Sequence, residues 1–240
     1  MLKIVSDPRT VVELVRGSYP RPVLLPNPFS KTLSKTLFNA LIAGFDKILA
    51  DPNRDQWMLD PETHNNGLIR RDPTEKEPNI DTKWMWHYSL YEFWDRVKKT
   101  GLDTRRYAWF LNMCHLIILT GINAVLPIIR ELDVQLPGYA FERNFRAADC
   151  FLRLIKDDLP CELGKLEVAT PHTDFSFCTL HWQETRPHLL WLDEKTKTWT
   201  PVDFDVDDQP SVFFLGRKAA LMTGGRREIE ADGTHSKRVL

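Results

Sequence analysis

The sequence lacks an excess of charge of either sign. Its 240 residues contain 32 lysines and arginines against 33 aspartates and glutamates, a formal net charge of −1. The basic residues do not gather in one block, so we expect no nucleic acid as a partner. Cysteine is also scarce. None of the four forms a C-x-x-C pair, which argues against a zinc ribbon and indicates reduced thiols (Cys114, Cys150, Cys161 and Cys178).

Long uninterrupted apolar runs are missing as well. The first residues, MLKIVSDPRTVVELVRG, lack the pattern of a signal peptide, so we expect a cytoplasmic protein. The stretch from Tyr107 to Ile129 is long enough to span a bilayer, but Asn112, His115 and Pro127 interrupt it and Gly121 divides it. This pattern predicts a pair of buried core helices and no membrane partner.

The first half of the chain is mainly helical in its pattern. Apolar residues recur at three- and four-residue spacing after Ser30, a plausible N-cap, and Asp51-Pro52 ends the run. Further helices are expected from about Tyr88 to Lys99, from near Asp103 and from near Gly121. Residues 52–80 are rich in Pro, Asn, Asp and Glu, and predict a long loop or short irregular strands around GLIRR.

The pattern changes after about residue 146. Short segments rich in β-branched and aromatic residues follow one another, several of them separated by turn residues, as is typical of an antiparallel sandwich or barrel. We therefore predict an α+β protein with one domain over 1–240, in which 1–145 form a helical flank and 146–240 a β core. The expected strands lie in 148–156, 166–172, 175–183, 188–193, 199–204, 211–216, 219–225 and 226–231.

One short motif in the second half has the side chains of a metal site. In a strand, His172 and Asp174 would project from the same face because they are two residues apart. A second histidine would complete the arrangement of two histidines and one carboxylate that leaves metal positions open for substrate and O2. His235 is the candidate. By itself the H-x-D motif is a weak signal.

The surroundings of this motif resemble the iron- and 2-oxoglutarate-dependent oxygenases of the isopenicillin N synthase-like family. The run HTDFSFCTLHWQ is followed in the family's order by Trp199-Thr200-Pro201-Val202, by a hydrophobic strand ending at Gly216, and by Thr223-Gly224-Gly225. GLIRR and DTKWMWHY are similar to the stretch before the family's central helices. The resemblance covers most of the chain and is best from residue 150 to 225.

The resemblance implies a double-stranded β-helix, or jelly roll, with a helical N-terminal flank. It also implies Fe(II) held by His172, Asp174 and a distal histidine. 2-Oxoglutarate would chelate the metal, and O2 would bind at the last open position. The family converts 2-oxoglutarate to succinate and CO2 while a small-molecule substrate is hydroxylated, desaturated or cyclised. Two neutral imidazoles and one carboxylate leave Fe(II) positively charged, which favours an anionic keto acid.

Two departures from the family pattern concern the site. The family's distal histidine directly precedes Arg-Val, where this sequence has Lys237, and His235 comes two positions earlier. We favour His235, because a protonated lysine cannot bind iron. The family also anchors 2-oxoglutarate with an Arg-x-Ser pair beyond the distal histidine, and this sequence ends first, so the β core is expected to lack its final strand. Arg153 and Arg217 are the candidate substitutes.

Two other classes of function remain open at this point. A non-catalytic jelly-roll binding or regulatory protein would keep the scaffold without productive iron or co-substrate binding. A zinc hydrolase would use the same three ligands. The remaining histidines, His115, His181 and His188, are expected to be structural, and Cys178 is expected to pack rather than to react. The aromatics of DTKWMWHYSLYEFW are expected in the core, with a substrate pocket as the alternative.

Overall fold

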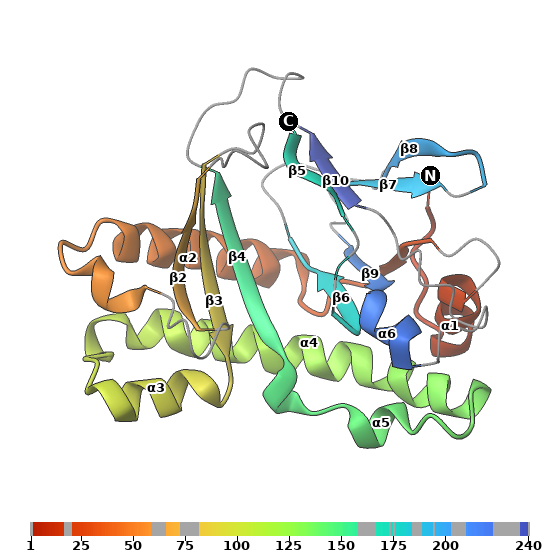
Figure 1. Ribbon diagram of the computed structural model, residues 1–240, viewed down its shortest axis with the longest axis horizontal. Coiled ribbons are helices and arrows are strands. Elements are labelled where there is room, and N and C mark those ends of the chain that lie inside the picture. Colours follow the sequence, from red (N-terminus) through yellow and green to blue (C-terminus); the bar gives the residue numbers. More distant parts are fainter. Residues whose placement is uncertain are drawn as a thin grey trace.

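The computed structural model describes residues 2–16, 21–58, 66–72, 82–157, 167–172, 174, 176–183, 189–193, 195–202, 210–222 and 236–239, with the side chains of 157, 167–172, 220 and 236–239 excluded. Helices and antiparallel sheets form two layers (Figure 1). The helices are α1 (Pro8–Arg16), α2 (Lys31–Leu49), α3 (Glu92–Thr100), α4 (Ala108–Gln135), α5 (Phe141–Asn144) and α6 (Arg217–Met222), with 3-10 turns at Arg54–Trp57, Arg105–Tyr107 and Ala147–Asp149.

The helix α2 begins and ends where the sequence predicts. The side chain of Ser30 accepts a hydrogen bond from the Leu33 backbone N–H at 3.4 Å and thereby caps the first turn. Gly101, with φ of 66°, ends α3 in the left-handed conformation that glycine adopts without strain. The start of α3 was predicted wrongly, because Tyr88 belongs to a strand that precedes it.

The long apolar stretch forms one continuous helix, α4, and not the predicted pair. Gly121 and Pro127 both lie inside it. Gly121 weakens a helix only modestly, and packing of one face compensates for that loss. By length and composition α4 would also suffice to cross a membrane. Here it lies beneath the sheets along the length of the molecule (Figure 1), and its buried face includes Phe110, Leu111, Cys114, Ile117, Ile118, Val125, Ile128, Ile129 and Leu132.

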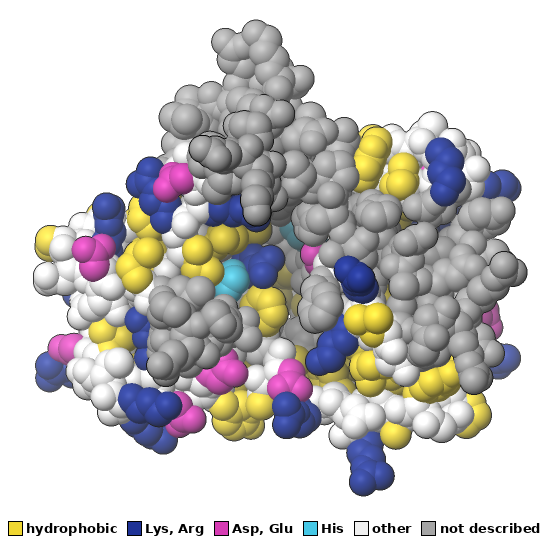
Figure 2. Space-filling view, viewed as in Figure 1, with side chains coloured by type: hydrophobic (Ala, Val, Ile, Leu, Met, Phe, Trp, Pro, Cys, Tyr) yellow, Lys and Arg dark blue, Asp and Glu magenta, His cyan; other side chains and the backbone are white. Residues whose placement is uncertain are grey.

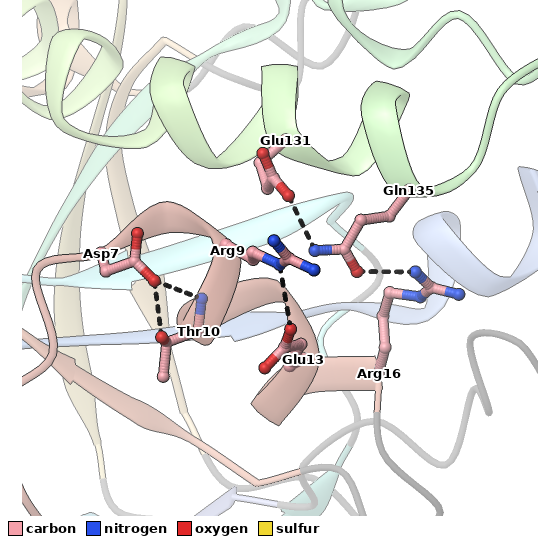
Figure 3. A network of polar contacts seen from close by, with 7 residues as sticks. All are labelled: Asp7, Arg9, Thr10, Glu13, Arg16, Glu131 and Gln135. Atoms are coloured by element: carbon pink, nitrogen blue, oxygen red, sulfur yellow. Dashed lines mark hydrogen bonds and ion pairs between the residues drawn. The ribbon is translucent and has the colours of Figure 1, made fainter.

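The N-terminal helix α1 is fixed against the C-terminal end of α4 (Figure 3). Asp7 caps α1 by accepting a hydrogen bond from the Thr10 backbone N–H at 2.9 Å. Arg16, in the last turn of α1, donates to the side-chain oxygen of Gln135 at 2.9 Å. Together with a shared apolar core that includes Val12 and Leu132, these contacts hold α1 against the C-terminal end of α4.

A three-stranded antiparallel sheet covers the other half of α4. It consists of β2 (Gly67–Arg71), β3 (Lys83–Ser89) and β4 (Phe151–Asp157), in the order β2-β3-β4. The alternate residues Trp84, Trp86 and Tyr88 of β3 are buried in the core against the helices. The prediction of a strand at GLIRR and of aromatic core packing is therefore confirmed, although β2 and β3 belong to the part expected to be helical.

The remaining strands form two further antiparallel sheets. One has the order β1-β9-β6 and the other the order β5-β10-β7-β8. Five of these seven strands, β5 to β9, fall in segments where the sequence predicted strands. The strand predicted over 219–225 was wrong, because α6 occupies Arg217–Met222. Residues 226–231 lie outside the described part. The strands are β1 (Val23–Leu25), β5 (Glu167–His172), β6 (Cys178–His181), β7 (Leu189–Asp193), β8 (Thr198–Pro201), β9 (Ser211–Leu215) and β10 (Ser236–Val239).

Candidate functional site

The two halves of the predicted metal site meet in one sheet. His172 is the last residue of β5, and its Cα pairs with that of Ser236, the first residue of β10. Ser236 directly follows His235 in the sequence. The antiparallel pairing of β5 with β10 thus joins the H-x-D segment to the segment of the distal histidine. The side chain of His172 and the whole of His235 lie outside the described residues.

The carboxylate of Asp174 is held by one hydroxyl group from the following strand, β6. The Thr179 hydroxyl donates to Oδ2 of Asp174 at 2.7 Å. The hydroxyl of Ser176 lies 2.9 Å from that of Thr179, so the two hydroxyls and the carboxylate form a short chain. An oriented carboxylate is what a metal site requires, because partners of a ligand fix its direction and tune its basicity.

Backbone contacts hold the same segment in place. The backbone N–H of Arg217 donates to the carbonyl of Asp174 at 2.7 Å, and that of Gly216 donates to the carbonyl of Phe177 at 2.9 Å. Gly216 is buried, and a Cβ placed on it would overlap the carbonyl oxygen of Ser176 and lie 2.7 Å from that of Asp174. Only glycine therefore permits this close approach between the end of β9 and the candidate ligand segment.

A cation from the neighbouring sheet lies within electrostatic range of Asp174. Arg153 of β4 donates from Nε to Nε2 of His87 at 2.9 Å, and its guanidinium lies 5.3 Å from the ring centre of Phe151. Burial among protein groups lowers the pKa of Arg153, whereas the charge of Asp174 raises it and that of Arg71 lowers it. Arg153 is nonetheless exposed at the surface.

The donor set suits a ferrous ion in chemical kind. Imidazole and carboxylate are the ligand types that non-haem Fe(II) sites use. The hydrogen bond that the Thr179 hydroxyl donates to Asp174 suits an ionised carboxylate, because such a group accepts hydrogen bonds. Within the described ranges, no three side chains of His, Cys, Asp or Glu form a group that could hold a metal ion. The predicted set of His172, Asp174 and His235 therefore stays a prediction, supported by the pairing of their segments.

The other candidate residues divide between structural roles and surface positions. Arg217 is exposed, and it contacts Asp174 through the backbone N–H of Arg217. His115 lies on α4, 3.4 Å from the hydroxyl of Tyr88, in a structural contact. Burial raises the pKa of the Cys178 thiol to about 12, so this thiol stays protonated and packs, as predicted. His181 ends β6, and His188 lies outside the described residues.

Known structures share this architecture at low sequence identity. The structure of JOX2 in complex with 2OG, Fe and JA matches with a TM-score of 0.67 at 15% identity, over 99% of this chain and 70% of that one. Dioxygenase for auxin oxidation 1 from Arabidopsis thaliana, in a complex with 2-oxoglutarate, matches with a TM-score of 0.60 at 16% identity, over 100% and 86%. The rice dioxygenase for auxin oxidation matches at 0.64 and 11%, over 100% and 78%.

The chain has the fold of the 2-oxoglutarate- and Fe(II)-dependent oxygenases. This finding confirms, for the fold, the resemblance inferred from the sequence. The match extends over the helical half as well as the strand-rich half, so the helices belong to the oxygenase fold and are not an unrelated addition. The sequence itself matches no protein-family model and no curated protein.

Sequence reasoning missed two partners of the site. Thr179 was seen only as part of a Thr-Leu run, although a hydroxyl residue that follows Asp174 by five positions is a signal for a partner of the carboxylate. His87 was assigned to an aromatic core segment. The period-two alternation of KWMWHYS assigns it to the face opposite Trp84, Trp86 and Tyr88, and the register of β3 with β4 places it opposite Arg153.

Proposed function

We propose that the protein is an Fe(II)- and 2-oxoglutarate-dependent dioxygenase that hydroxylates, desaturates or cyclises a small molecule. The observation that carries this proposal is the pairing of Ser236 with His172, because it brings the segment of His235 to the H-x-D segment. The oxygenase fold supports it independently. Solved neighbours with this fold bind 2OG, Fe and JA in one case and 2-oxoglutarate in another, which makes a small-molecule substrate the natural inference.

We further infer that the strands β1 and β5–β10 belong to a double-stranded β-helix. The two sheets β1-β9-β6 and β5-β10-β7-β8 are antiparallel, and in each of them strands far apart in sequence are neighbours. Such pairing is typical of a jelly roll. In this arrangement β5 and β6, which flank Asp174, lie in different sheets, so the candidate ligands sit where the two sheets meet.

In this proposal His172, Asp174 and His235 would hold Fe(II). When bound together with 2-oxoglutarate and O2, the metal supplies an oxidant for an unactivated C–H bond, at the expense of conversion of 2-oxoglutarate to succinate and CO2. The chain's own contribution is orientation. Thr179 holds one carboxylate oxygen of Asp174, and the N–H of Arg217 holds the backbone carbonyl of Asp174, so both the side chain and the backbone of this candidate ligand are oriented.

Two cations remain candidates for the distal carboxylate of 2-oxoglutarate. Arg153 is in electrostatic range of Asp174, and Arg217 adjoins the segment through its backbone. A guanidinium suits either place, because its planar donors match the two oxygens of a carboxylate. Titration of 2-oxoglutarate into Arg153→Gln and Arg217→Gln tests both: the variant that lacks the anchor should bind the keto acid at least tenfold more weakly.

The proposal is tested by anaerobic addition of Fe(II) and 2-oxoglutarate to the purified protein. We expect a weak charge-transfer band in the visible spectrum, which is lost in His172→Ala and Asp174→Ala. His235→Ala should also lose it, whereas Lys237→Ala should keep it. His115→Ala is the matched control, because His115 lies on α4 and contacts Tyr88. No band with the unmodified protein, although iron and keto acid are present, would favour the non-catalytic alternative.

A further inference from the structure

The sheet β2-β3-β4 has two faces of opposite character. The face formed by Trp84, Trp86 and Tyr88, with Leu152 and Leu154, packs on the helices. Cross-strand pairing places the alternate residues on the other face: His87 opposite Arg153, and Met85 opposite Ile155 and Ile69. The position of the His87 ring, 5.5 Å from that of Phe151, agrees with this assignment.

This second face, which we call the open face, exposes large apolar side chains. Phe151 is 37% exposed and Ile155 is 39% exposed, two residues on either side of Arg153. Met85 and Ile69 are half-buried beside them. Exposed apolar side chains that adjoin one another, with a charged group in their midst, are typical of a ligand surface rather than of ordinary protein exterior.

Several charged residues share the open face. Lys83 lies opposite Arg71 of β2 and opposite Asp157 of β4 at one end of the sheet, and Arg153 lies nearer the middle. The charge of Arg71 lowers the pKa of Arg153, which means that the two cations repel each other. Of the three guanidinium nitrogens of Arg153, only Nε donates a hydrogen bond within the described part of the chain. An anion near Arg71 and Arg153 would reduce the repulsion and accept two parallel hydrogen bonds from the Arg153 guanidinium.

The open face adjoins the candidate metal site. The charge of Asp174 acts on the Arg153 guanidinium, so the two side chains lie within electrostatic range of each other. In Figure 2 a hollow opens near the centre of the view, between the positions of β4 and β6 in Figure 1. Hydrophobic, basic and histidine side chains border it, and an acidic side chain is visible further in.

We propose that the open face of β2-β3-β4 binds the prime substrate, and that this substrate is an apolar molecule bearing a carboxylate that Arg153 receives. The inference rests on the proposed function, because it is the adjoining metal site that makes a bound molecule a substrate. 2-Oxoglutarate fits the open face less well, since it is short and charged at both ends and would leave Phe151 and Ile155 uncovered. His87 positions the guanidinium through the bond to Nε.

The test measures binding to the metal-free protein, with 3-phenylpropionate and octanoate as probes in calorimetric or ligand-observed NMR titrations. The matched neutral probes are 3-phenylpropan-1-ol and octan-1-ol. We expect both acids to bind, and the alcohols to bind about tenfold more weakly or worse, because they lack the charge-assisted hydrogen bonds. Arg153→Gln should weaken the acids by a similar factor, and Ile155→Gln should weaken acids and alcohols alike.

Lys156→Gln is the matched control. Lys156 lies on the same strand, but its ammonium group pairs with Asp46 of α2 on the helical side of the sheet. This variant should bind the acids like the unmodified protein. Arg153→Lys separates charge from shape: it keeps the charge, loses the planar fork, and should bind the acids with intermediate affinity. Both Arg153 variants should fold, because the residue is exposed.

Three results would overturn the inference: no binding of either acid, equal binding of acid and alcohol, or a loss in Arg153→Gln of 2-oxoglutarate binding with the acids unaffected. The last result would assign Arg153 to the co-substrate. Asp174→Asn gives an independent check. Removing the opposing carboxylate should strengthen acid binding several-fold in the absence of metal. If the acids bind through Arg153 but the loaded protein forms no succinate, the surface stands and the proposed function fails.

Discussion

The hydroxyl of Thr179 lies 2.7 Å from Oδ2 of Asp174, and the hydroxyl of Ser176 lies 2.9 Å from that of Thr179. Both hydroxyls belong to the turn and strand that follow Asp174. A segment of six residues therefore supplies hydroxyl groups that orient the candidate iron ligand.

Replacement of Thr179 should weaken metal binding while the fold persists. Thr179→Val keeps the shape but removes the donor, and loss of such a partner typically costs about 10- to 100-fold in metal affinity. Calorimetric titration with Co(II) in place of Fe(II), without 2-oxoglutarate, measures the metal affinity in the absence of turnover. Thr179→Ser restores a hydroxyl and should recover most of the affinity. Equal affinity in the valine and serine variants would show that the bond to Asp174 does not serve the metal.

Gly216 should tolerate no side chain. In Gly216→Ala the new methyl group would overlap the Ser176 carbonyl and lie 2.7 Å from the Asp174 carbonyl, and both are backbone atoms that cannot rotate away. We expect the free energy of unfolding to fall by about 1–3 kcal/mol and metal affinity to fall with it. Urea unfolding and metal titration measure the two effects.

Gly121→Ala is the matched control for that prediction. Its Cβ would meet only the Leu180 side chain, at an ordinary 3.8 Å, in the interior of α4. Alanine is the better helix former, so this variant should be more stable by about 0.5–1 kcal/mol. If Gly216→Ala proved as harmless as Gly121→Ala, the close approach at the end of β9 would not constrain the site.

The buried pair of Asp51 and Tyr107 should contribute to stability in a pH-dependent way. The Tyr107 hydroxyl donates to Oδ2 of Asp51 at 2.5 Å, and Asp51 is only 4% exposed. Tyr107→Phe should lower the free energy of unfolding near neutral pH by about 1–3 kcal/mol, because it leaves a buried carboxylate without this donor. Tyr91→Phe, at an exposed position, should change nothing measurable.

The pH dependence of that pair has a defined direction at both ends. The bond from Tyr107 lowers the pKa of Asp51 below 3.8, so the contribution of Asp51 is present above that value and is lost as the pH falls through the lowered pKa. Burial raises the pKa of Tyr107 to about 12, so its contribution is present below about pH 10 and is lost as the pH rises towards 12. Tyr107→Phe should flatten both limbs of the stability profile measured by urea unfolding.

Local sequence patterns correctly predicted α2 and most strands of the second half, because capping, apolar spacing and turn residues determine these elements. The side chain of Ser30 and the spacing of apolar residues after it were sufficient for α2. Alternation and turn residues were sufficient for most strands of the second half. The segment at Arg217–Met222 was missed because a short apolar run fits a strand and a helix equally well. The extent of α4 was missed because buried packing overrides the helix-breaking tendencies of Gly121 and Pro127.

The site was predictable as far as its chemistry lies in short motifs. H-x-D and its surroundings identified the segment of His172 and Asp174, and the resemblance identified the fold. The proximity of Arg153 and His87 was not predictable, because these residues are 66 positions apart and meet only through the register of β3 with β4. Pairing of distant strands depends on the whole core, and neither residue carries a local signal for it.

The central claim is most directly tested by single-turnover conversion of 2-oxoglutarate. The protein is loaded anaerobically with Fe(II) and one equivalent of labelled 2-oxoglutarate, exposed to O2, and assayed for labelled succinate. The account predicts succinate formation by the unmodified protein, and only background amounts with Asp174→Ala, His172→Ala or His235→Ala. Succinate formation that survives in Asp174→Ala, or its absence from unmodified protein that has bound both iron and keto acid, would contradict it.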